Sequence, residues 1–139
     1  MARIRFLIAQ FFFQWGATHR HFGIAHGLNK EFERAAYYFG RAYTIDPTFR
    51  QARLNRAIML GRELGRGPEA LAEFDALLAE DSLYMEARFN RAQQRQEMGD
   101  YAGALADWEL YLLHPDENYK DLAESTVKLL REVLLPPKS

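Results

Sequence analysis

The amino-acid sequence predicts an all-α fold, a right-handed αα-hairpin solenoid of about three repeats with a half-repeat helix before them and a closing helix after them. The first observation is a recurring triplet, an alanine followed by an aromatic residue and then a small or apolar one, at Ala35/Phe39/Ala42, Ala70/Phe74/Leu77 and Ala104/Trp108/Tyr111. The triplets lie 35 and then 34 residues apart, a period typical of helical repeats. The second observation is that Gly-, Asn- or Pro-containing turns separate two amphipathic halves in every unit.

Composition limits what this chain can be. Its 139 residues are 48% hydrophobic and carry a formal net charge of −1, so we expect one domain over 1–139 and no global field that would attract nucleic acid or an anionic membrane. Cysteine is absent, which excludes disulfides and thiolate chemistry. The near-zero net charge favours other protein chains as partners.

The opening segment, residues 1–15, is predicted to be a helix that forms half of a repeat. Ala2, Phe6 and Ala9 repeat the triplet, so the segment resembles the second half of a hairpin whose first half is missing. Arg3 and Arg5 before the apolar run are also found in signal peptides. Because the run is shorter than the roughly 20 residues needed to cross a bilayer, we expect neither a cleaved signal nor a membrane span.

Three hairpins are predicted to follow, as repeat 1 (16–49), repeat 2 (50–84) and repeat 3 (85–117). Each has a turn in its middle, and the turns are Gly27-Leu-Asn29, Gly65-Arg-Gly-Pro68 and Gly99-Asp100. Each ends at a proline or a short polar residue, which are Asp46-Pro47, Asp81-Ser82 and His114-Pro115. The second repeat has one extra residue, which we place around Gly65–Gly67, and the third repeat lacks one residue before Pro115.

Apolar residues at helical intervals continue after the third hairpin and predict a closing helix over 118–135. They are Leu122, Val127, Leu130, Val133 and Leu134. The pair Pro136-Pro137 is expected to end this helix.

The chain from about Gly16 to Pro115 resembles the tetratricopeptide (TPR) family. Phe22-Gly23, Ala35, Phe39, Ala42 and Pro47 match the family pattern in the first repeat, and Gly99-Asp-Tyr101, Ala104 and Trp108 match it in the third. Arginines stand where the family often has large apolar residues, at Arg53, Arg56, Arg88 and Arg91. We expect their heads to meet acidic residues such as Asp46, Asp75, Asp81 or Asp107.

The resemblance implies a concave groove formed mainly by the first helix of each hairpin. Its predicted lining residues are Arg20, Ile24, Asn55, Ile58, Arg62, Phe89, Asn90 and Gln93. In the family, groove asparagines hydrogen-bond an extended peptide, which Asn55 and Asn90 could do. The family's clamp for chaperone tails is not expected here, because Arg20 and Asn55 fit it while Ile24, Glu86 and Asn90 do not.

Sequence patterns do not favour catalysis, metal binding or nucleic-acid binding. Catalytic and phosphate-binding motifs are absent, so we predict a non-enzyme without a cofactor. The spacing of His19, His21 and His26 does not complete a zinc site. The arginine series from Arg50 to Arg66 lacks the stacking aromatics and is diluted by acids.

The ends of the chain carry the strongest functional signal. Large apolar residues surround the opening helix, and terminal repeats normally present polar faces, so we predict a self-association interface between the opening and closing segments. Its residues are Phe6, Phe11, Phe12, Phe13, Trp15, Leu122, Leu130 and Leu134. The main hypothesis is a head-to-tail ring, filament or tube, and the alternative is an adaptor that binds a peptide in its groove or docks its aromatic N-terminus on a larger complex. The compartment stays open between a cytoplasmic and an extracellular location.

Overall fold

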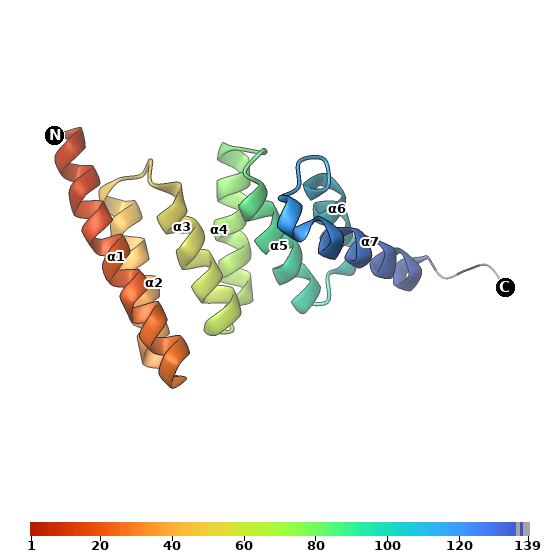
Figure 1. The fold of residues 1–139 in the computed structure, drawn as a ribbon, viewed down its shortest axis with the longest axis horizontal. Helices are drawn as coiled ribbons and strands as arrows, with labels where there is room; N and C mark the ends of the chain where they lie inside the picture. Colours follow the sequence, from red (N-terminus) through yellow and green to blue (C-terminus); the bar gives the residue numbers. More distant parts are fainter. Residues whose placement is uncertain (136, 138–139) are drawn as a thin grey trace. The chain divides into compact units, whose positions relative to one another are not determined.

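The computed structural model describes residues 1–135 and 137, and every regular element among them is helical. The order is α1 (Ala2–His26), α2 (Asn29–Ile45), α3 (Arg50–Ile58), the π-helix η1 (Met59–Glu63), α4 (Gly67–Glu80), α5 (Met85–Glu97), α6 (Tyr101–Tyr111), the 3₁₀ helix η2 (Glu117–Tyr119) and α7 (Lys120–Leu134) (Figure 1). The all-α class is therefore confirmed. The chain forms two compact units, Met1–Glu73 and Phe74–Ser139, with the division inside α4. That residues 1–139 unfold as one domain stays a prediction.

The first unit is dominated by the hairpin of α1 and α2. Gly27 ends α1 in the left-handed conformation, with φ of 64°, which a residue with a side chain rarely adopts. Small residues on α1 then let α2 approach closely. A Cβ added to Gly16 would lie 2.8 Å from the Phe39 ring, and one added to Gly23 would lie 2.7 Å from Phe32. The two rings fill the space that the glycines leave.

The predicted division between an opening helix over residues 1–15 and a first repeat over 16–49 does not appear as a break in the helix. Residues 2–26 form the single helix α1, which is 25 residues long. The opening segment is helical, as expected, but it extends the first helix of repeat 1 and is not a second hairpin helix. The reason is local, because no proline interrupts the segment and Gly16 is buried against α2.

The extra residue of the second repeat lies in the π-helix η1, several positions before the predicted Gly65–Gly67. There the amide of Leu64 donates to the carbonyl of Met59, five positions back, at 3.0 Å, and after the helix ends the amide of Arg66 donates to the carbonyl of Leu60, six positions back, at 2.7 Å. A π-helix accommodates one inserted residue by hydrogen bonds that span five positions. The insertion is thus absorbed inside the hairpin and not in its turn.

The second unit contains α5, α6 and α7 around one apolar core. Its buried members are Ala92, Ala104, Trp108, Tyr111, Ala123, Val127 and Leu130. The closing helix α7 runs over Lys120–Leu134, close to the predicted 118–135. Pro136 of the predicted Pro136-Pro137 stop lies outside the described residues.

Candidate functional site

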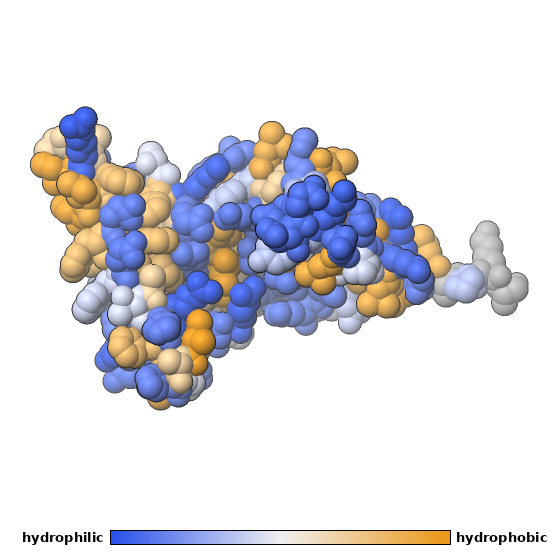
Figure 2. Space-filling view, viewed as in Figure 1, coloured by the Kyte–Doolittle hydropathy of each residue, from blue (hydrophilic) through white to orange (hydrophobic). Residues whose placement is uncertain are grey.

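The outward face of α1 is an exposed apolar surface, which we call the outer stripe. It consists of Ile4, Ile8, Phe11, Trp15 and Phe22, whose exposed fractions are 57%, 44%, 64%, 45% and 49%. Neighbouring members are three, four or seven positions apart, so they share one face of the helix. Figure 2 shows hydrophobic colouring over the N-terminal part of α1.

The inward face of α1 has the opposite character. Ala9, Gly16 and Gly23 recur every seven residues, are buried, and are the small residues that admit α2. The helix therefore has one set of residues for its own hairpin and a second set that its own hairpin covers only in part. A contiguous apolar surface of this kind usually marks an interaction site.

The structure divides the predicted aromatic interface. Phe11 and Trp15 lie on the outer stripe with their rings stacked at 6.3 Å, and Phe6 is also 46% exposed. Phe13 instead packs between Phe39 at 5.4 Å and Phe49 at 4.8 Å. Phe13 is thus partly buried against the core of its own unit, and its assignment to an interface with another chain stays a prediction.

Phe12 is intermediate between these two situations. Its ring stacks on Tyr38 at 6.0 Å, and the guanidinium of Arg41 lies over it at 5.6 Å. It therefore closes the flank of its own hairpin while remaining partly exposed.

Helix α7 also has a second apolar surface, the α7 stripe. It consists of Leu122, Thr126, Leu129 and Val133, and the three apolar members are 48%, 56% and 58% exposed. Of the predicted interface residues, Leu122 belongs to this stripe and Leu134 is half-buried. Leu130 is only 3% exposed because it points into the core of the second unit, so its assignment to the interface is wrong.

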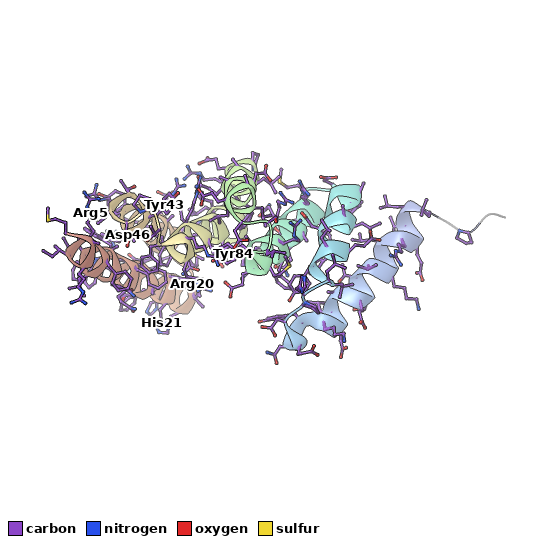
Figure 3. The ribbon with its side chains drawn as sticks, turned by 90° about the horizontal axis from the view of Figure 1, so that it is seen from above. Arg5, Arg20, His21, Tyr43, Asp46 and Tyr84 are labelled. Atoms are coloured by element: carbon purple, nitrogen blue, oxygen red, sulfur yellow. The ribbon has the colours of Figure 1, made fainter. Side chains whose placement is uncertain are left out.

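The predicted groove residues fall in both units. In the first unit, Ile24 is 60% exposed, Arg62 is exposed and Ile58 packs against the core. Arg20 is half-buried, and its Nε meets no acceptor among the described residues. Figure 3 shows Arg20 and His21 on α1, with Arg5 nearer the N-terminus. Asn55 accepts a hydrogen bond from Gln51 at 3.3 Å.

In the second unit, Phe89 packs edge-on against Trp108 at 5.1 Å. The amide of Asn90 donates to the backbone carbonyl of Glu86 at 2.7 Å, one turn back in its own helix. Gln93 lines a hollow of about 370 Å³ with Trp108 and Leu122. That all eight residues form one groove stays a prediction.

Arginines make a second kind of cluster, in which the charges are mutually neutralised. The carboxylate of Asp107 is 1% exposed and accepts hydrogen bonds from Arg88 at 3.2 Å, Arg91 at 2.7 and 2.9 Å, and Arg95 at 2.8 Å. Burial disfavours the charged form of Arg91, but its hydrogen bonds to Asp107 and Asp75 outweigh this effect and raise its pKa. The cluster holds α5 to α6.

A comparable set lies in the first unit, around a hollow of about 460 Å³. Arg53 donates to Glu73 at 2.8 Å and to the Tyr43 hydroxyl at 3.0 Å, and Arg56 approaches Glu73 at 3.4 Å. Burial disfavours the charge of Arg53, and the Glu73 carboxylate raises its pKa above the ordinary value. Arg66 pairs with Glu69 at 2.7 Å. These side chains act as structural ion pairs.

Two further observations concern sites of other classes. Among the described residues, no three histidines, aspartates or glutamates converge as a metal site would require. No helix in the described part of the chain is long and apolar enough to cross a membrane.

Comparison with known proteins identifies the fold. No family model matches the sequence, and no curated protein matches it. The first TPR of Spaghetti (RPAP3), solved bound to the HSP90 peptide SRMEEVD, superposes with a TM-score of 0.76 at 19% identity, over 91% of this chain and 92% of that one. The Sgt2 TPR domain from Aspergillus fumigatus gives a TM-score of 0.72 at 21% identity, over 94% and 86%. The chain has the TPR fold. The predicted resemblance is therefore confirmed at the level of the fold.

Proposed function

We propose that this protein is a non-catalytic TPR scaffold that binds other protein chains, and that its partners include copies of itself. The outer stripe of α1 is the observation that carries the proposal. It leaves 64% of Phe11 and 45% of Trp15 exposed, although burying such side chains is worth about 1.5–3 kcal/mol each. The α7 stripe offers a second apolar surface near the other end of the chain. Contact between unlike surfaces of identical chains gives a ring when the rotation closes and a filament or tube when it does not.

The neighbouring Spaghetti domain was solved with an HSP90 peptide, which supports peptide binding in the groove as the second candidate function. For this chain the amide of Asn90 is bonded within its own helix and Asn55 accepts from Gln51. A peptide would have to displace these hydrogen bonds. The exposed apolar surfaces need no such rearrangement, so self-association is the first candidate.

Substituting the outer stripe tests the proposal. Phe11→Asp should abolish association, because truncating a buried Phe costs about 3–5 kcal/mol and an unpaired carboxylate adds a desolvation cost. Helicity and the melting temperature should change little, since Phe11 is mostly exposed within its own chain. Light scattering gives the particle mass, and circular dichroism gives the helicity.

Leu113→Asp is the matched control. Leu113 is 67% exposed and lies between α6 and η2, outside both stripes. This variant should keep the wild-type particle mass. A wild-type chain that stays at its monomer mass of 16.2 kDa at high concentration would contradict self-association and favour the peptide-binding adaptor.

A further inference from the structure

The two exposed stripes have the same spacing. On α1, Ile4, Ile8, Phe11 and Trp15 follow one another at steps of four, three and four residues. On α7, Leu122, Thr126, Leu129 and Val133 have the same steps. These four residues of the outer stripe and the whole α7 stripe each extend about 17 Å along their helices, and side chains with this period interdigitate when two helices pack lengthwise.

The borders of the two stripes differ in charge. Helix α1 contains Arg3, Arg5 and Arg20 but no aspartate or glutamate. Arg3 lies on the solvent-facing border of the outer stripe, since it is one position before Ile4 and exposed. The corresponding border of the α7 stripe carries Asp121, Lys128 and Glu132, each exposed and one position before a stripe residue, so its net charge is negative. A second α1 would repel the first, whereas α7 complements it.

We infer that the outer stripe of α1 receives α7 of a second copy in the antiparallel direction, with Arg3 of one copy opposite Glu132 of the other. The inference rests on the proposed self-association and specifies its contact. Matching the steps in this direction places Val133 beside Ile4 and Leu122 beside Trp15. When the two helices are antiparallel, the solvent-facing border of the outer stripe and that of the α7 stripe lie on the same side of the contact. Arg3 then lies opposite Glu132.

Helix electrostatics favour the antiparallel direction. α1 begins without a side-chain cap or an acidic residue in its first turn, and Arg3 adds positive charge where the helix dipole is already positive. The last turn of α7 is the negative end of its helix dipole and contains Glu132 and Arg131, of which Arg131 pairs with Glu109 at 2.7 Å. Antiparallel packing brings these opposite ends together. Parallel packing would instead align Asp121 with Arg5 on the other border.

Charge exchange across the contact tests this arrangement in the full chain. Arg3→Glu should weaken association about tenfold, because an attraction becomes a repulsion at the edge of the contact. It should not unfold α1, since an acidic residue in the first turn suits the helix dipole. Adding Glu132→Lys to Arg3→Glu should restore the wild-type association. Concentration-dependent light scattering gives the midpoint, and circular dichroism checks the fold.

The parallel arrangement has a matched pair of variants. If Arg5→Glu is rescued by Asp121→Lys while Arg3→Glu is not rescued by Glu132→Lys, the antiparallel inference is overturned and self-association stands. Association that neither pair changes would also overturn it. A wild type that stays monomeric but cosediments with vesicles of anionic phosphatidylglycerol, and loses this with Phe11→Asp, would mean that the outer stripe meets a membrane surface. That outcome overturns both this inference and the proposed function.

Discussion

The α1–α2 and α5–α6 hairpins share one backbone plan but are held together by different chemistry. In the first, glycines on α1 receive the rings of Phe39 and Phe32, and the close packing is almost wholly apolar. In the second, the alanines Ala92 and Ala104 meet at the core, and beside them a buried carboxylate gathers three guanidinium groups. The small residues at the crossing are thus the shared requirement, and the surrounding interactions can be apolar or ionic.

The ionic hairpin gives the largest expected effect. Asp107→Ala leaves Arg88, Arg91 and Arg95 without their common partner, so we expect a loss of about 3 kcal/mol or more in the free energy of unfolding. Asp75→Ala is the control, because the Asp75 side chain is 57% exposed and pairs with Arg91 at 2.9 Å. It should cost less than about 1 kcal/mol. Urea denaturation measures both, and equal losses would show that burial of Asp107 adds nothing.

The apolar hairpin should respond to volume instead of charge. Gly16→Val forces a side chain into the buried ring of Phe39, and we expect a loss of about 1–3 kcal/mol. Ala25→Val, on the exposed side of the same helix, should change stability by no more than about 0.5 kcal/mol.

A second substitution sharpens this test. Phe39→Leu reduces the ring that Gly16→Val would strike, so the double variant should lose less than the sum of the single losses. Thermal unfolding followed by circular dichroism gives the three values. Strict additivity would mean that Gly16 and Phe39 do not constrain each other.

The same comparison explains what sequence could predict. Ala35, Ala70 and Ala104 are each 0% exposed, as the triplet spacing indicated, because a helical period fixes which positions face inward. The partners Asp107 and Asp75 were named correctly for Arg91. Arg95 was missed as a member of the cluster, because its reach to Asp107 depends on how α5 and α6 cross.

Other features depend on information that periodicity does not contain. The length of the second repeat shows that it has one extra residue. Length alone does not show whether a longer turn or a π-helix accommodates that residue. Glu73 was missed as the partner of Arg53 and Arg56 because helical periodicity does not show which acidic side chain of α4 faces the arginines of α3. Leu130 was assigned to an interface because an amphipathic pattern does not reveal which apolar face is already covered.

The smallest expected effect concerns a hydrogen bond between polar side chains in the otherwise apolar α1–α2 hairpin. Nδ1 of His19 lies 2.5 Å from Oε2 of Glu31, and Tyr38 stacks on the His19 ring at 5.3 Å. The hydrogen bond to His19 is the main cause that lowers the pKa of Glu31 below its ordinary value of 4.5, against a smaller effect of burial and with help from Arg34. Glu31 is thus more acidic in the folded than in the unfolded chain.

The sign of the pH dependence follows from that difference. A carboxyl group with a lowered pKa in the folded state stabilises the protein above its unfolded pKa, and this contribution is lost as the pH falls through the folded pKa. Glu31→Gln should therefore be less stable than wild type at neutral pH, and the gap should close as the pH falls below about 4.5. His19→Gln should produce a similar loss at neutral pH, and combining the two substitutions should add little, because each removes the same hydrogen bond. Urea denaturation from about pH 6 to about pH 3 measures the gap, and a gap that stays constant over this range would show that the pair does not link α1 to α2.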